Sequence, residues 1–367
     1  MSTKTSGRAG RRPPSLSAAA MSALGPEAAH RATIRALANG VTPRFRPVTD
    51  PALEIMVWGR RFPNPIGIAA GFDKNAEAVD GVFALGVGFT EVGGVTPRPQ
   101  RGSLRPRVFR LRQDRAVVNR LGFNNDGLQI VAERLRARRR DPVARSRLVG
   151  VNIGANANSV DRVADYETVL RGLWGLCAFY TLNVSSPNTP GLRGLQEPEA
   201  LTDLLTRLLT CRNALADETG VWAPLLVKVD PDLSNDGLRK LAEVASGCGV
   251  DGMVATNTTV ARSGALRSRN AGRSGGLSGE PLFGRSTEAL RILRRATNGA
   301  VPLIGVGGVG GPEQAYAKIR AGASLVQLYT GLIYQGPGLV TRIARGLGDM
   351  LRADGFERLE QAVGADA

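Results

Sequence analysis

Histidine, cysteine and aromatic residues are scarce in this chain. The single histidine, His30, lies in the N-terminal segment, so we expect no histidine to serve as a base in a site built from later residues. The three cysteines, Cys177, Cys211 and Cys248, lie far apart without paired spacing, which argues against a disulfide framework and against a metal site. We therefore predict core thiols in a reducing compartment, and no metal.

Long apolar runs and acidic residues are also in short supply. No run approaches the roughly 20 residues that cross a bilayer, so we expect the chain not to span a membrane. Lys and Arg number 48 against 32 Asp and Glu, a net charge of +16 that suits anionic ligands, anionic lipid or nucleic acid. Most arginine runs fall on predicted helices without interleaved aromatics, so we interpret them as solvated faces and expect no nucleic-acid partner.

Strand-like and helical patterns alternate through most of the 367 residues. The predicted strands cover residues 66–69, 89–95, 148–153, 179–184, 225–229, 252–256, 303–306 and 325–329. Helical patterns between them include 128–138, 200–215, 237–247, 286–296 and 312–321. Repeated strand-then-helix units predict an α/β protein with a parallel sheet, and eight of them indicate a closed (β/α)8 barrel, the TIM barrel.

The two ends of the chain differ from this repeat. Residues 1–20 carry no acid and no secretory signal, which predicts a mobile basic tail. A helical pattern opens at Pro26 and ends near Gly40, so we predict a small N-terminal helical segment over 21–45. The barrel is then expected over 46–355, followed by a C-terminal tail over 356–367.

Polar residues and glycines follow every predicted strand, at the end where such barrels bind ligands. They occupy positions 71–75, 96–98, 152–156, 183–193, 228, 256–258, 305–308 and 329–330. This convergence predicts one binding site at the carboxyl end of the barrel.

The loop over residues 183–193 carries the most chemistry. Its prolines hold Ser186 and Thr189 in extended geometry, although an ordinary Asn/Ser/Pro turn is the alternative interpretation. Carboxylates are sparse in the predicted mouth, where Asp73 is the main one and is expected to orient Lys74. Proton abstraction then falls to Ser186, a weak base that needs a relay through Thr189 or water and a coupled reaction such as hydride removal to a flavin.

Two further features predict the ligands. Gly307, Gly308, Tyr329 and Thr330 stand where barrels bind phosphate, and 275–279 adds a flexible loop rich in donors, so a cofactor with a phosphate tail is implied. Lys228 lies inside an apolar strand and should face an anion or an electron-rich ring. A lysine and four amides suit a planar, anionic, amide-bearing substrate: Lys74, Asn119, Asn183, Asn188 and Asn257.

Taken in order, these motifs resemble the class 2, quinone-dependent dihydroorotate dehydrogenases of pyrimidine synthesis. The motifs that carry the resemblance are AGFDK at 70–74, VTPRPQ at 95–100, NRLGFN at 119–124, NIG at 152–154, NVSSPNTPGLR at 183–193, ATNTT at 255–259, GGLSG at 275–279 and VGG at 306–308. The resemblance implies oxidation of (S)-dihydroorotate to orotate, with FMN as hydride acceptor and a quinone as final electron acceptor. Ser186 would take the C5 proton with the help of Thr189, whereas class 1 relatives have cysteine at that position.

The resemblance also assigns residues to each ligand. FMN would be held by Ala70, Gly71, Phe72, Asp73, Lys74, Gly94, Asn152, Asn183, Lys228, Thr256, Gly279, Gly308, Tyr329 and Thr330. Dihydroorotate would meet Lys74, Asn119, Arg120, Leu121, Gly122, Phe123, Asn183, Asn188, Asn257 and Thr258, with Phe123 joining Ser186 and Thr189 in the catalytic group. A ubiquinone-type quinone would meet His30, Arg110 and Tyr329.

Class 2 relatives rest on the membrane through their N-terminal helices, so the resemblance implies peripheral binding on the cytoplasmic side of an anionic inner membrane. We also expect a monomer. The Arg/Ser-rich start also resembles a mitochondrial presequence, but no anchor follows it, and we favour a bacterial membrane. Three features depart from the family pattern. Gly94 stands where Thr or Ser is usual, Asp230 stands where Ala is usual, and residues 16–24 are rich in small residues where relatives have larger aromatic and aliphatic ones.

Two alternatives remain open. One is a different FMN barrel, either a class 1 dehydrogenase or a tRNA-reducing flavoenzyme, for which a cysteine is expected in the loop where Ser186 stands. The other is a non-catalytic basic protein that binds membrane or nucleic acid. A flavin spectrum bleached by dihydroorotate would exclude the latter.

Overall fold

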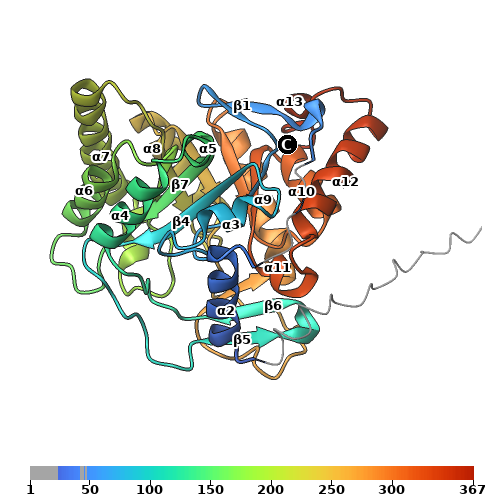
Figure 1. The fold of residues 1–367 in the computed structure, drawn as a ribbon, viewed down its shortest axis with the longest axis horizontal. Helices are drawn as coiled ribbons and strands as arrows, with labels where there is room; N and C mark the ends of the chain where they lie inside the picture. Colours follow the sequence, from blue (N-terminus) through green and yellow to red (C-terminus); the bar gives the residue numbers. More distant parts are fainter. Residues whose placement is uncertain (1–23, 42–44, 46–47) are drawn as a thin grey trace, which may run out of the picture.

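A closed parallel barrel forms the centre of the molecule (Figure 1). The computed structural model describes residues 24–41, 45 and 48–367, so the predicted basic tail lies outside the described residues. Neighbouring strands follow the order β10-β12-β13-β3-β4-β7-β8-β9, and β9 pairs with β10 to close the ring. The strands are β3 (Ile66–Ile68), β4 (Phe89–Val95), β7 (Leu148–Ile153), β8 (Phe179–Asn183), β9 (Leu225–Val229), β10 (Gly252–Ala255), β12 (Leu303–Val306) and β13 (Ala323–Leu328).

All eight predicted strands are confirmed, with ends that shift by at most two residues. Every residue of β8 and β9 is buried, as expected for parallel strands covered on both faces. The register places Asn183 opposite Lys228 and Gly93 opposite Asn152, so the polar residues of these strands reach the same end of the barrel.

Helices surround the barrel and begin or end at recognisable signals. Ser234 caps α8 by accepting the Gly237 N–H at 3.0 Å, and Gly220 and Gly249 end α7 and α8 with positive φ. The helices are α2 (Pro26–Ala38), α3 (Val79–Phe83), α4 (Leu128–Arg138), α5 (Pro142–Ser146), α6 (Arg162–Leu173), α7 (Pro198–Thr219), α8 (Asn235–Cys248), α9 (Phe283–Ala296), α10 (Pro312–Arg320), α11 (Thr330–Gln335), α12 (Leu339–Ala353) and α13 (Leu359–Ala362). The helical patterns predicted from the sequence correspond to α4 and α7–α10, and the N-terminal one to α2.

A cluster of edge-to-face aromatic rings fills the amino end of the barrel. The hairpin of β1 (Ile55–Val57) and β2 (Arg60–Phe62) brings Trp58 and Phe62 against Phe89 and Phe179, with ring centroids 5.5 to 6.2 Å apart. Phe62, Phe89 and Phe179 are fully buried. Room for the rings comes partly from Gly150, where an added Cβ would lie 2.1 Å from the Phe179 ring.

A second, smaller sheet lies beside α2 below the barrel in Figure 1. Its antiparallel strands are β5 (Val108–Leu111), β6 (Ala116–Asn119) and β11 (Gly276–Gly279). The prediction of a flexible loop at 275–279 is therefore wrong, because Gly276 to Gly279 pair with β6 and Leu277 is buried against Phe109 and Val118. The donors of this segment are held in a strand.

The chain ends are packed against the rest of the fold where they are described. Ala29, Ile34 and Leu37 of α2 are buried. Residues 356–367, expected as a tail, include α13, and its Leu359 and Ala362 are fully buried. Among the residues with described placement, no helix is long and apolar enough to cross a membrane.

Candidate active site

A cavity of about 970 Å³ opens at the carboxyl ends of the strands and extends to α2. Lys74, Ser186 and Lys228 all line it, although they come from three different strand ends. The expected convergence on one mouth is therefore present.

Most residues that the sequence assigned to ligands line this cavity. They are His30, Ala70, Gly71, Phe72, Lys74, Gly94, Arg110, Asn119, Leu121, Gly122, Phe123, Asn152, Asn183, Ser186, Asn188, Lys228, Thr256, Asn257, Thr258, Gly279, Gly308, Tyr329 and Thr330. Three assigned residues are absent from the lining: Asp73, Arg120 and Thr189.

These three residues have other contacts or lie behind the wall. Asp73 accepts the backbone N–H groups of Glu77 and Ala78 at 2.9 and 2.8 Å, so it shapes the loop after β3 rather than orienting Lys74 as expected. Arg120 donates to the Ser274 hydroxyl and the Pro106 carbonyl, at the surface. Thr189 is buried, and its Oγ1 has no hydrogen-bond partner among the described residues.

A chain of hydrogen-bonded amide side chains lines the cavity, and a buried carboxylate fixes which end of each amide donates. Glu91 of β4 is fully buried and accepts the Asn152 Nδ2 group at 2.8 Å and the Gln327 Nε2 group at 2.6 Å. Asn152 Oδ1 in turn accepts Asn183 Nδ2 at 2.8 Å, and Asn183 Oδ1 accepts Asn257 Nδ2 at 3.0 Å. Since a carboxylate can only accept, every amide in the chain has a defined orientation.

The loop after β8 holds Ser186 at the cavity wall. Ser186 is 8% exposed, and its Oγ accepts the backbone N–H of Asn188 at 3.3 Å. The preceding Ser185 accepts Asn257 Nδ2 at 3.0 Å, while the Tyr166 hydroxyl holds the Asn183 carbonyl at 2.8 Å. The loop is thus tied to the neighbouring strand ends instead of being free.

Two lysines make the cavity electropositive, Lys228 buried and Lys74 partly buried. Burial, and then the charge of Arg107, lower the pKa of Lys74 to about 8. Burial also lowers the pKa of Lys228, while the charge of Glu91 opposes the shift. No hydrogen bond joins Lys228 Nζ to any other described residue, so its ammonium group is available to a ligand in the cavity.

Phe123 covers the position where Gly94 departs from the family pattern. An added Cβ on Gly94 would lie 2.7 Å from Cε1 of Phe123 and 3.2 Å from Oδ1 of Asn152. Phe123 has a φ of 51° and is 7% exposed, so it is held in an unusual backbone conformation inside the wall. The absent side chain at Gly94 makes room for this ring.

Aromatic groups line the cavity where it reaches α2. The Tyr329 hydroxyl lies 3.3 Å from Nδ1 of His30, and the Phe72 ring packs at 5.7 Å from the His30 ring and 5.4 Å from the Tyr329 ring. Burial, and then the charge of Lys74, lower the pKa of His30 to about 4, so the ring is neutral at physiological pH. This end suits an apolar, uncharged ligand.

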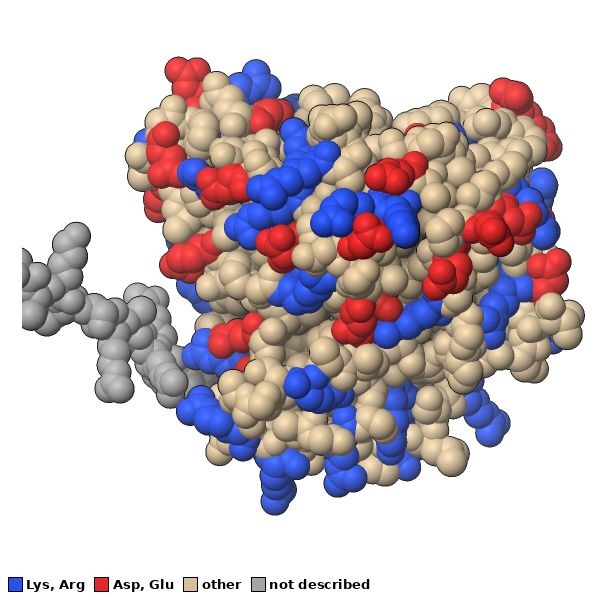
Figure 2. All heavy atoms as spheres, turned by 180° about the vertical axis from the view of Figure 1, so that it is seen from behind, with Lys and Arg blue, Asp and Glu red and all other residues tan. Residues whose placement is uncertain are grey.

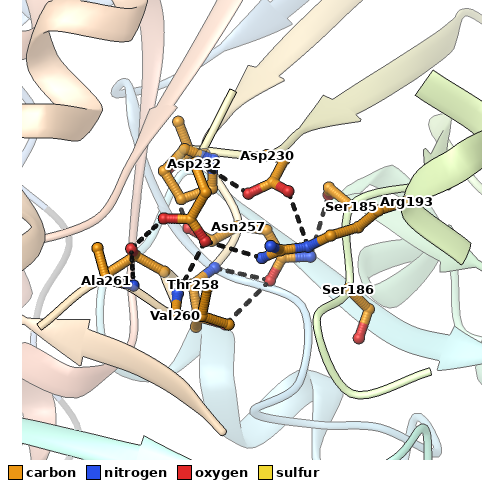
Figure 3. Close-up of polar contacts among 12 residues, drawn as sticks. Ser185, Ser186, Arg193, Asp230, Asp232, Asn257, Thr258, Val260 and Ala261 are labelled. Carbon is orange, nitrogen blue, oxygen red and sulfur yellow. Dashed lines mark hydrogen bonds and ion pairs between the residues drawn. The ribbon is translucent and has the colours of Figure 1, made fainter. Parts of the chain in front are cut away.

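Sequence reasoning missed two groups near the site. Glu91 was not predicted because it is a single acidic residue inside a sequence segment with an apolar, strand-like pattern. The other is the cluster in Figure 3, where Asp230 and Asp232 contact Arg193, the last residue of the Ser186 loop. The sequence showed that Asp230 departs from the expected alanine, but it did not show that Arg193 would be the partner of this carboxylate.

Comparisons with known proteins agree on one family. The family model described as dihydroorotate dehydrogenase matches residues 52–351. The chain is 52% identical over 344 residues to the dihydroorotate dehydrogenase (quinone) of Rhodospirillum rubrum, covering 94% of this chain and 92% of the relative, and 52% identical over 346 residues to that of Parvibaculum lavamentivorans, covering 94% and 96%. The crystal structure of DHODH from Eimeria tenella in complex with ferulenol superposes with a TM-score of 0.90 at 38% identity, covering 93% of this chain and 96% of that one.

Proposed function

The chain belongs to the dihydroorotate dehydrogenase family in its quinone-dependent type, and from that membership we propose that its cavity holds FMN and that Ser186 is the base toward dihydroorotate. Its activity is the oxidation of dihydroorotate with a quinone as electron acceptor, in pyrimidine biosynthesis, by a flavin-dependent enzyme. The observation that carries the proposal is the single cavity shared by Lys74, Ser186 and Lys228.

The residues of the cavity fit FMN. Lys228 offers a buried ammonium that makes no hydrogen bond to the described residues, suited to an electron-rich ring. At Gly71, with φ of 93°, nothing lies within 4 Å of an added Cβ, so a ligand can approach the backbone there. Gly279 and Gly308 also line the cavity, near the Ser278 and Thr330 hydroxyls that lie 2.8 Å apart, a donor set suited to a phosphate tail. When bound, FMN supplies the acceptor for the hydride that leaves C6 of dihydroorotate.

Ser186 and Thr189 handle the proton. Oxidation of dihydroorotate also removes a proton from C5, and we assign this proton to Ser186 Oγ. The Asn188 N–H donated to Ser186 Oγ orients the hydroxyl. Thr189 Oγ1 is buried, has no hydrogen-bond partner among the described residues, and can hold a water that passes the proton onward.

Lys74 and the amides bind the substrate. The Lys74 ammonium suits the carboxylate of dihydroorotate, and Asn119, Asn188 and Asn257 offer amides to its ring. Asn188 Nδ2 lies 3.4 Å from Asn119 Oδ1, so these amides are already neighbours. Because Glu91 orients Asn183 and Asn257 through Asn152, their hydrogen-bonding groups are preorganised.

The α2 side of the cavity is the proposed quinone entrance, with His30, Arg110 and Tyr329 as contacts. Figure 2 shows basic side chains protruding from the lower end of the molecule, the end that carries α2, β5 and β6 in Figure 1, with no acidic side chain visible among them. Leu104 is 89% exposed beside α2 and the small sheet. The exposed arginines of α2 and of the segments that flank β5 and β11 are Arg31, Arg35, Arg101, Arg105, Arg112, Arg267, Arg269 and Arg273. This combination supports peripheral binding to an anionic membrane.

Replacing Ser186 with alanine tests the proposed base. Ser186→Ala should keep its flavin but slow flavin reduction by dihydroorotate by about 10²- to 10⁴-fold, the usual contribution of a general base. Ser146→Ala, at an exposed position on α5, serves as the control. Stopped-flow absorbance measures the reduction, and steady-state assays compare quinone, fumarate and NAD as acceptors. Normal reduction by Ser186→Ala would refute the assignment of the base.

A further inference from the structure

Asp230 stands two residues beyond Lys228, where the family pattern has alanine. It is 3% exposed, and its Oδ2 lies 2.7 Å from Nε of Arg193 (Figure 3). Its Oδ1 accepts the backbone N–H of Asp232 at 2.9 Å. Both carboxylate oxygens are therefore used, one of them on a side chain from another part of the chain.

Arg193 connects two segments of the active site. It lies at the end of the loop that carries Ser186, in the short helix η3 (Leu192–Gln196). Its Nη2 donates to Oδ2 of Asp232 at 3.1 Å, and the same carboxylate accepts the Val260 N–H at 2.8 Å and the Thr259 hydroxyl. Arg193 thus joins the Ser186 loop to the segment that follows Asn257 and Thr258.

The Ser186 loop is held at both of its ends. On its amino side Ser185 accepts Asn257 Nδ2, and on its carboxyl side Arg193 is paired with Asp230 and Asp232. We propose that Asp230 is a positioning residue that holds Arg193, and through it the Ser186 loop, in the geometry needed for proton abstraction. The inference rests on the proposed role of Ser186.

The charges around Asp230 make its effect depend on pH. Arg193 faces it from η3, Asp232 lies beside it on the same segment, and Arg285 from α9 acts on it electrostatically while donating to the carbonyls of Pro231 and Leu233. Burial raises the pKa of Asp230 to about 6, against the opposing effects of the Asp232 N–H and of Arg193. The carboxylate is therefore charged above pH 6 and loses its charge below it, so its hold on Arg193 weakens in acid.

The test compares Asp230→Asn and Asp230→Ala with wild type. Alanine is the residue of the family pattern, and Asp236→Asn, an exposed aspartate on α8 paired with Lys240, is the matched control. Anaerobic stopped-flow follows flavin reduction by saturating dihydroorotate from pH 5 to 8, and absorbance titration gives the Kd of orotate. Flavin content and Tm are measured on each protein.

We expect both Asp230 variants to keep full flavin content and to reduce it about 5- to 20-fold more slowly at pH 7.5, with the Kd of orotate changed less than twofold. Wild-type and Asp236→Asn rates should fall below an inflection near pH 6 that Asp230→Asn lacks. Adding Asp230→Asn to an Arg193→Gln variant should slow reduction no further, because Arg193→Gln has already removed the contact with Asp230, along with the one to Asp232.

Asp230→Asn rates equal to wild type at pH 7.5, or the same pH profile in Asp230→Asn and wild type, would overturn the inference. If Asp230→Ala fails to fold, Asp230→Asn, which keeps the size of the side chain, still decides. Failure of the proposed function has a different signature, since dihydroorotate would then leave the wild-type flavin oxidised or Ser186→Ala would react at the normal rate.

Discussion

Introducing a hydroxyl residue at position 94 should harm this protein, although the resemblance described above led us to expect Thr or Ser there. In Gly94→Ser the new Cβ would lie 2.7 and 2.8 Å from two atoms of the Phe123 ring and 3.2 Å from Asn152 Oδ1. Carbon atoms prefer separations of roughly 3.5–4.0 Å, so the ring must retreat by about 1 Å. Phe123 is buried with a positive φ and has little freedom to do so.

The size of the effect follows from overpacking, which costs about 1–3 kcal/mol in a well-packed wall. Because Phe123 lines the cavity in the segment assigned to substrate, we expect this cost to appear as weaker orotate binding. At 1.4 kcal/mol for each factor of ten, the Kd should rise roughly 5- to 150-fold. A second change, Phe123→Leu, should recover part of this loss in the Gly94→Ser background, because leucine occupies less of the contested space.

Titration of the flavin absorbance with orotate measures the Kd, and thermal unfolding reports the stability of each variant. Gly247→Ser is the control, since nothing lies within 4 Å of an added Cβ at that position of α8. The steric reasoning is refuted if Gly94→Ser binds orotate as wild type does and unfolds at the same temperature.

Two further predictions concern the two lysines of the cavity. With its pKa lowered to about 8, Lys74 is charged below that pH and neutral above it. The wild-type Kd for orotate should therefore stay constant up to about pH 8 and then rise, whereas Lys74→Gln should bind orotate weakly at every pH. A wild-type Kd that stays constant to pH 9.5 would contradict this. Lys228→Met should keep the fold by circular dichroism but purify with little flavin, measured as the ratio of absorbance at the flavin band to that of protein, and a full complement of flavin would show that the ammonium is dispensable.

The barrel could be predicted because its signals are local. Each of the eight strands is a short apolar run followed by glycine or polar residues, and these patterns depend little on distant parts of the chain. Asn183 and Lys228 could likewise be placed at one end of the barrel, since parallel strands present their carboxyl ends together.

Features built from distant partners could not be predicted in the same way. Gly276 to Gly279 have the composition of a loop, and they form a strand only because β6, more than 150 residues earlier in the chain, lies beside them. Asp73 was expected to orient Lys74 because the two are adjacent in sequence, yet the nearby N–H groups of Glu77 and Ala78 satisfy its carboxylate. The strand thus depends on a partner far along the chain, whereas the Asp73 carboxylate is satisfied by backbone groups of its own loop and not by the adjacent lysine.

The cluster of Trp58, Phe62, Phe89 and Phe179 fills the amino end of the barrel, opposite the cavity at the carboxyl ends of the strands. No ligand is expected to pass through that end. A bulky group attached there should therefore leave reduction of the flavin by dihydroorotate and its reoxidation by quinone at their normal rates.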